Sequence, residues 1–199
     1  MSFKLPKILT HNLNVYEPSD DSYLLLEGIR KNLSLKKFKN KKIKVLDLCT
    51  GTGIIGLTVK LNFSLAEVIC SDISDEALLC TLLNSFENSL TIKLIKSDMF
   101  KDIPRIKFDI ILCNPPYLKK EDELDDNYLD LHTIDKGQVN EFLTNVHDFL
   151  KKSSFAYLIL SSTNLPDLSQ YEKIQIKKIA EKSFFFEKLF LYEIRKRNH

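Results

Sequence analysis

The tetrapeptide Asn114-Pro115-Pro116-Tyr117 has the most specific chemistry in the sequence. A residue that precedes proline is pushed towards extended geometry, so Asn114 and Pro115 are both expected to be extended. Neither proline has an N–H, and this backbone therefore presents carbonyl acceptors without competing donors. The side-chain oxygen of Asn114 and the carbonyl of Pro115 can then converge on a planar NH2 group, while Tyr117 packs against its plane.

The chemistry that suits such a tetrapeptide is alkylation of an amide or aromatic amine nitrogen. The lone pair of such a nitrogen is delocalised, so it is a poor nucleophile. Two acceptors on its N–H bonds return electron density to it and aim it at an electrophilic carbon. This requires neither a metal nor a general base. The alternative, a proline-rich loop terminator, is disfavoured because the tetrapeptide directly follows an apolar strand predicted over residues 108–113.

A glycine turn at residues 49–53, Cys-Thr-Gly-Thr-Gly, joins a predicted strand to a predicted helix. Gly51 and Gly53 allow a tight turn and a close approach of a ligand to the main chain. Residues 51–56 also match the dinucleotide pattern G-x-G-x-x-G, which is weak evidence alone because ordinary tight connections produce it too.

Three acidic residues, Asp47, Asp72 and Asp98, lie in or directly after three successive predicted strands. In a nucleotide-binding fold, Asp72 would accept hydrogen bonds from the ribose hydroxyls. Asp98 could accept a hydrogen bond from the exocyclic amine of adenine, with Met99 beside the adenine ring. Each acid alone is as consistent with a structural role as with a functional one. The three together favour a nucleoside site, because the carboxyl ends of parallel strands meet at one edge of the sheet.

The composition predicts one globular α/β domain. The chain has 199 residues, 44% apolar and 28% charged, with a net charge of only +2, which does not indicate a nucleic-acid partner. The four cysteines have no Cys-x-x-Cys spacing and are interpreted as buried thiols in a reducing compartment, not as disulfides or metal ligands. No signal-type or membrane-spanning run is present, so we expect a cytoplasmic protein.

Short β-branched runs alternate with helical patterns, which is typical of parallel βαβ architecture. Strands are predicted at 43–48, 66–71, 91–96, 108–113 and 155–161, and helices at 19–29, 54–61, 74–86 and 139–150. The first and fourth strands are almost continuously apolar and should be central. The last two runs, 174–179 and 188–194, are close enough to predict an antiparallel hairpin.

The predicted fold is therefore a doubly wound, seven-stranded, mostly parallel sheet with an antiparallel C-terminal hairpin. An arm at residues 1–18 precedes the domain, residues 19–199. In the helix that Ser74 is expected to cap, the residues predicted to face inward are Ala77, Leu78, Leu82 and Phe86.

Together, residues 47–53, Asp72, Asp98 and the tetrapeptide resemble the motifs of class I methyltransferases, which are Rossmann-like enzymes that use S-adenosylmethionine. The tetrapeptide is similar to that of amino-group methyltransferases. Residues 15–26, Val-Tyr-Glu-Pro-Ser-Asp-Asp-Ser-Tyr-Leu-Leu-Leu, resemble the opening of the short archaeal and eukaryotic branch of the HemK family, and residues 180–190 resemble archaeal members. The similarity to the family covers nearly the whole chain and is weaker between residues 118 and 136.

This resemblance implies methylation of the glutamine amide in the Gly-Gly-Gln loop of a translation release factor, with S-adenosylhomocysteine as the second product. It makes Asn114, Pro115, Pro116 and Tyr117 the catalytic residues. The residues that it assigns to the cofactor are Ser22, Asp47, Cys49, Gly51, Gly53, Asp72, Ile73, Asp98, Met99 and Asn114. Cys49 stands where the family has a first glycine. Its side chain is small, so we expect the turn to form if this residue keeps a negative φ.

The resemblance also implies a small zinc-binding activator subunit that adds strands to the edge at residues 91–96. The alternating apolar residues there would otherwise form an open edge. Lysines at 93 and 96 could instead protect the edge without a partner.

Three alternative functions share part of this pattern. An enzyme that methylates the exocyclic amine of adenine or guanine in RNA or DNA would need the same tetrapeptide. The near-neutral charge, the absence of an added recognition domain and the acidic stretch at 121–126 favour a protein substrate. A nicotinamide-dependent oxidoreductase would share the glycine turn but leave the tetrapeptide unexplained. A non-catalytic subunit is disfavoured because the motifs are intact.

Overall fold

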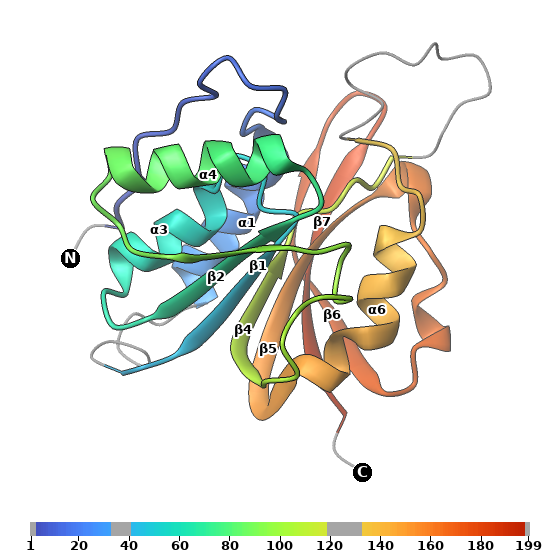
Figure 1. Ribbon diagram of the computed structural model, residues 1–199. Coiled ribbons are helices and arrows are strands. Elements are labelled where there is room, and N and C mark those ends of the chain that lie inside the picture. The colour runs from blue at the N-terminus through green and yellow to red at the C-terminus, as the bar shows by residue number, and fades with distance from the viewer. Residues whose placement is uncertain (1–2, 33–40, 119–132, 198–199) are drawn as a thin grey trace.

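The computed structural model describes residues 3–32, 41–118 and 133–197, and Figure 1 shows their arrangement around one central sheet. The strands are β1 (Lys44–Leu48), β2 (Glu67–Asp72), β3 (Lys93–Lys96), β4 (Phe108–Cys113), β5 (Leu150–Ser161), β6 (Ile174–Ser183) and β7 (Lys188–Lys196). The helices are α1 (Asp20–Asn32), α3 (Ile54–Asn62), α4 (Asp75–Glu87) and α6 (Gln138–Phe149). The predicted α/β class is confirmed.

The seven strands lie in the order β3-β2-β1-β4-β5-β7-β6. The first five strands are parallel, and β7 pairs antiparallel with both β5 and β6. β1 and β4 are neighbours at the centre and almost fully buried, as their continuous apolar runs predicted. Because the chain winds outward in both directions from this pair, a crevice opens at the carboxyl ends of β1 and β4.

Helices cover both faces of the sheet (Figure 1). Apolar residues of α1 and α3, including Ile29 and Val59, share one buried cluster with the inward side chains of β1 and β4. On the other face α6 contributes Phe142 and Phe149 to a second cluster, where Phe149 stacks on Phe100 with ring centroids 4.6 Å apart. No helix in the described ranges is long and apolar enough to cross a membrane.

Two strands extend beyond their predicted limits. β5 begins at Leu150 instead of residue 155, because Leu150 pairs with Phe108 and Lys151 contacts Asp109 at 2.6 Å. β6 continues to Ser183, since it pairs with β7 along the full hairpin. As the outermost strand, β6 has an exposed polar face, and this masks the alternation that identifies a strand.

The inward face of α4 differs from the prediction. Phe86 was expected in the core but is 69% exposed, and Leu78 and Leu82 are only half-buried. The buried residues of this helix are Ala77, Cys80, Thr81, Asn84 and Ser85. They follow the spacing of three and four that one helix face requires, and several are polar because they bind the arm and the glycine turn. The cap at Ser74 is confirmed, with its Oγ accepting from Ala77 N at 3.3 Å.

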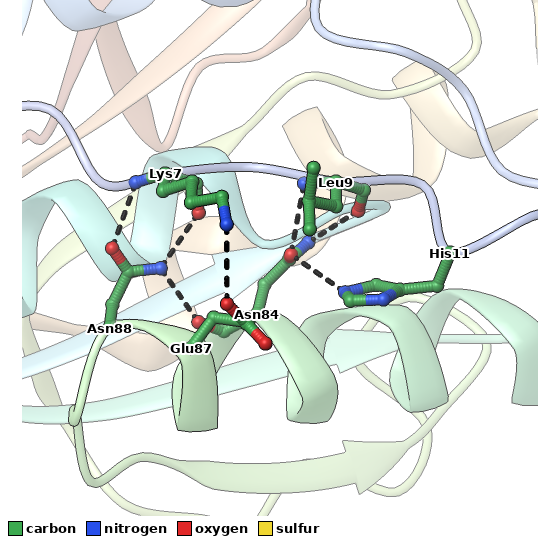
Figure 2. Close-up of polar contacts among 6 residues, drawn as sticks. All are labelled: Lys7, Leu9, His11, Asn84, Glu87 and Asn88. Carbon is green, nitrogen blue, oxygen red and sulfur yellow. Dashed lines mark hydrogen bonds and ion pairs between the residues drawn. The ribbon is translucent and has the colours of Figure 1, made fainter.

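The arm runs along α4 through two asparagine side chains (Figure 2). The amide of Asn84 accepts from Leu9 N at 3.0 Å and donates to Leu9 O at 2.9 Å. One helical turn later, the amide of Asn88 accepts from Lys7 N at 2.8 Å and donates to Lys7 O at 2.7 Å. One turn of helix advances about 5.4 Å and two extended residues span about 6.6 Å, so the two repeats nearly match. The helix therefore pairs with the arm much as a neighbouring strand would.

Candidate active site

A cavity of about 280 Å³ lies at the carboxyl edge of the sheet. Its walls come from the arm, the glycine turn, the ends of β2 and β3, and the tetrapeptide after β4. The predicted site residues that line it are Ser22, Cys49, Gly51, Asp72, Ile73, Asp98, Met99, Asn114, Pro115, Pro116 and Tyr117. Residues from five separate segments of the sequence therefore meet at one site.

Two predicted cofactor residues, Asp47 and Gly53, do not line the cavity and instead shape the turn. Asp47 is fully buried, and its Oδ2 accepts from Thr50 Oγ1 at 2.6 Å and from Gly56 N at 2.9 Å. Gly53 has a φ of 84°, and a Cβ there would lie 2.9 Å from the side chain of Thr81. Both residues thus fix the backbone path on which the cavity wall depends.

Burial raises the pKa of Asp47 to about 7, while the hydrogen bonds from Thr50 and Gly56 oppose this rise. The second oxygen, Oδ1, is buried and has no hydrogen-bond partner among the described residues. Such an environment disfavours the charged carboxylate, because an unpaired buried charge loses its hydration. The charge of Asp47 therefore changes close to neutral pH.

The condition expected for the turn, a negative φ at Cys49, is not met. Its φ is +56°, in the left-handed region, and Met99 opposite has a φ of +48°. The Sγ of Cys49 lies 3.7 Å from the Sδ of Met99. The turn still forms, because Thr50 N donates to Ser71 O at 3.0 Å and closes the backbone. A left-handed residue other than glycine costs on the order of 1 kcal/mol, and such strain is concentrated at ligand sites.

Asp72 at the end of β2 connects the turn to the next helix. Its Oδ2 accepts from Gly51 N at 3.0 Å, and its Oδ1 accepts from Ser74 N at 3.0 Å. A carboxylate has about four acceptor positions, so these two backbone donors do not exhaust its capacity. The side chain thus supports the turn and also lines the cavity.

Asp98 lines the same cavity and forms an ion pair with Lys101. The hydrogen bond to Asp98, followed by its charge, raises the pKa of Lys101. Both side chains are substantially exposed, so the pair adds little to stability. An adenine amine would share this carboxylate with the lysine.

Asn114 has an unused acceptor. Its Nδ2 donates to Ser22 Oγ at 3.4 Å, whereas its Oδ1 is buried without a hydrogen-bond partner in the described ranges. A buried oxygen with no donor costs about 1–3 kcal/mol, and most buried polar atoms in native structures have a partner. Since Asn114 lines the cavity, a donor on a bound molecule would satisfy this oxygen.

Asp21 is not among the predicted site residues, yet it connects three cavity residues. Its Oδ2 accepts from the hydroxyls of Tyr16 at 3.2 Å and Tyr117 at 3.0 Å. Its Oδ1 accepts from Ser22 N at 2.5 Å and Ser22 Oγ at 3.1 Å, and Ser22 in turn contacts Asn114. One buried carboxylate thus orients both ends of the tetrapeptide. The sequence signal, an acid in the first turn of a helix, has a simpler explanation in the helix dipole.

Burial raises the pKa of Tyr16 and that of Tyr117, and the negative charge of Asp21 raises both further. Their hydroxyls remain protonated at physiological pH and act as hydrogen-bond donors to Asp21. Tyr117 therefore positions the tetrapeptide and does not act as a base.

The arm and the glycine turn are connected through α4. Asn84 Nδ2 donates to Thr52 O at 2.9 Å, and Thr81 Oγ1 donates to Gly51 O at 2.9 Å. Asn84 also accepts from the ring of His11 at 3.1 Å (Figure 2). Because the arm further supplies Val15 and Tyr16 to the cavity wall, α4 aligns two walls of the site.

Comparison with known proteins agrees with this geometry. Residues 20–133 match the family model described as methyltransferase small domain. A putative protein N5-glutamine methyltransferase of Methanocaldococcus jannaschii is 34% identical over 154 residues, which are 74% of this chain and 73% of that protein. The release factor glutamine methyltransferase of Clostridium botulinum is 35% identical over 109 residues, covering 52% of this chain and 37% of that protein.

Among solved structures, the ribosomal protein L11 methylase of Lactobacillus delbrueckii subsp. bulgaricus shares the fold. The TM-score is 0.68, and the match covers 92% of this chain and 82% of that one. The sequences are only 19% identical, so the likeness concerns the architecture alone.

Proposed function

Since this chain belongs to the methyltransferase small domain family, and within it to the S-adenosylmethionine-dependent HemK group, we propose that it methylates the side-chain amide of a glutamine in a protein substrate. The proposed target is the Gly-Gly-Gln loop of a translation release factor. The names of its relatives support a protein substrate, namely N5-glutamine and release factor glutamine methyltransferases. The match to the archaeal relative supports a protein glutamine as the acceptor, whereas the release factor as target rests on bacterial relatives such as the clostridial one, of which the chain spans 37%.

The observation that carries the proposal is the buried Oδ1 of Asn114 in the cavity wall, which has no hydrogen-bond partner among the residues that the structure describes. A glutamine amide brings an NH2 group with two donors, and one of them satisfies this oxygen. We assign the second acceptor to the carbonyl of Pro115. The two acceptors would hold the nitrogen in one orientation, and fixed dipoles of this kind need no reorganisation during reaction.

The other site residues have supporting roles in this proposal. Tyr117, fixed by Asp21, would lie against the amide plane, and Ser22 would keep the Asn114 amide in place. S-adenosylmethionine supplies an activated methyl group when it is bound. We assign its contacts to the glycine turn, Asp72, Asp98 and the apolar residues Ile73 and Met99. Ile73 suits this role, because it is 62% exposed and lines the cavity.

We also propose a cellular location and a partner subunit for the protein. A release-factor substrate places the enzyme in the cytoplasm, where the four free thiols stay reduced. The edge strand β3, with half-buried Leu94 and Ile95, is the site for strand addition by a small zinc-binding subunit. Protection of the β3 amides from hydrogen exchange on adding that subunit would support this pairing, and unchanged exchange would contradict it.

The direct test is mass spectrometry of the cognate release factor after incubation with this protein and labelled cofactor. We expect one methyl group on the glutamine of the Gly-Gly-Gln loop, and none after Asn114→Ala, which should still bind the cofactor. Bulk RNA serves as the competing acceptor. Label that enters RNA and not the release factor, or full turnover by the Asn114 variant, would overturn the proposal.

A further inference from the structure

The turn of the β6–β7 hairpin, residues 184–187, has an exposed aromatic surface that we call the hairpin tip. Ser183 pairs with Lys188 at its base. Phe185 and Phe186 are 92% and 89% exposed, and their rings pack edge to face on each other with centroids 4.6 Å apart. Two adjacent aromatic side chains that are mainly in contact with each other and with water form a surface suited to burial by a partner.

The hairpin tip lies at the same edge of the sheet as the cavity. In the antiparallel register of β5 and β7, Leu189 is opposite Ser161, the last residue of β5. The tip therefore lies beyond the carboxyl ends of the parallel strands, as the red hairpin in Figure 1 shows. The pKa values of Tyr16 and Tyr117 are raised by burial, by Asp21 and, to a smaller extent, by the charge of Glu187. Leu189, next to the base of the tip, also belongs to the buried cluster against which Tyr117 packs, so the base of the tip lies near the cavity wall.

Contacts at both sides fix the hairpin tip. Phe184 N donates to Glu187 O at 2.7 Å across the turn. Lys188 N donates to Ser162 Oγ at 2.9 Å, and Lys182 pairs with Asp20 of α1 at 2.7 Å. A surface that is already ordered loses little conformational entropy when a partner binds.

We propose that the hairpin tip docks the protein substrate, with Phe185 and Phe186 inserting into an apolar surface of the domain that carries the methylated glutamine. This inference rests on the proposed function. A cavity of about 280 Å³ cannot take up a folded domain, so only the glutamine side chain would enter it and the remainder of the substrate must lie against the rim. The aromatic tip supplies the apolar contact on that rim, and buried aromatic residues carry much of the binding energy of protein interfaces.

The test is a kinetic comparison of two substrates, the intact cognate release factor and a short synthetic peptide with the Gly-Gly-Gln sequence. In the double variant Phe185→Ser/Phe186→Ser we expect KM for the intact factor to rise about 30-fold, as removal of a binding hot spot predicts. kcat, cofactor affinity and turnover of the peptide should stay unchanged. Phe86→Ser is the matched control, because Phe86 is an equally apolar, exposed residue on the outer face of α4.

Other outcomes would overturn the docking role. An unchanged KM for the intact factor in the double variant would contradict docking by the tip. An equal loss of kcat/KM with the intact factor and with the peptide would mean that the tip only shapes the cavity. If the unaltered protein is a dimer in sedimentation and the double variant is a monomer, the tip serves self-association. If the unaltered protein binds a single-stranded RNA oligonucleotide and the double variant does not, while KM for the factor is unchanged, the tip serves base stacking. If the unaltered protein methylates neither substrate, the proposed function has failed and this inference with it.

Discussion

The carboxylate of Asp21 accepts a hydrogen bond from the hydroxyl of Tyr117 at 3.0 Å, across 96 residues of sequence. The same oxygen accepts from Tyr16, and the other oxygen accepts from Ser22. The opening of α1 and the end of β4 are thereby joined at the cavity. The orientation of the tetrapeptide depends on a helix that precedes the glycine turn in sequence.

Asp21→Asn should lower kcat about 10- to 100-fold while leaving cofactor affinity nearly unchanged. The substitution keeps the shape but replaces one acceptor oxygen by an NH2 group, which cannot accept from both tyrosines, and hydrogen bonds to charged groups contribute about 1.5–3 kcal/mol. Initial-rate kinetics and calorimetry of cofactor binding measure the two effects. Asp20→Asn, which alters the neighbouring exposed pair with Lys182, is the control and should retain kcat. Equal kcat in both variants would remove the positioning role of Asp21.

The features that could be predicted from sequence are those governed by local pattern. β1 and β4 were placed at the centre because their runs are continuously apolar, and the cavity was placed at their carboxyl ends because motif residues follow them. Asp72 and Asn114 line the cavity for that reason. Their positions depend on the topology of a parallel sheet more than on any detail of packing.

The features that could not be predicted depend on partners remote in sequence. Asn84 is a polar residue in a helix, and its partners remote in sequence, the arm 75 residues earlier and Thr52 in the glycine turn, make it a core residue in place of Phe86. Asp47 has the residue type of a ligand but contacts Thr50 and Gly56 beneath the turn. The sign of φ at Cys49 follows from the closure of the turn on β2, which no local preference reveals.

Cys49→Gly should raise the free energy of unfolding by about 1 kcal/mol, because glycine adopts the left-handed φ of +56° without the steric cost of a side chain. Cys49→Ala is the matched control, since it removes the thiol but retains the strained backbone. Urea unfolding of the three proteins measures the difference. If alanine stabilises as much as glycine does, the thiol and not the backbone is the source of the strain.

The pKa of Asp47 predicts a pH dependence of stability. In the unfolded chain the carboxyl ionises near its ordinary value of 3.8, whereas in the folded protein its pKa is about 7. Below pH 4 both states are protonated and Asp47 imposes no penalty. Between these values the unfolded chain releases a proton that the folded protein keeps. The contribution of Asp47 to the unfolding free energy therefore falls as pH rises, by on the order of 4 kcal/mol up to pH 7.

Asp47→Asn tests this dependence, because the amide stays neutral while its oxygen can still accept from Thr50 and Gly56. Relative to the unaltered protein, the variant should gain stability progressively between pH 4 and 7 in urea unfolding. A stability difference that is constant over this range would mean that Asp47 ionises in the folded protein as it does in the unfolded chain.

Asn84→Ala should weaken cofactor binding, whereas Asn88→Ala should not. Both side chains pair with the backbone of the arm (Figure 2). Only Asn84 also donates to Thr52 O in the glycine turn, at 2.9 Å. Removing Asn84 leaves Leu9 N and Thr52 O without this partner, so the part of the arm that carries Tyr16 is held less firmly against the cavity. We therefore expect a cofactor Kd about 10-fold higher. Asn88→Ala should only increase hydrogen exchange at Lys7. Calorimetry on the two variants separates these effects, because the loss of an arm contact is common to both. Equal weakening would mean that the arm alone controls cofactor affinity, and unchanged affinity in both would mean that the turn holds its shape without α4.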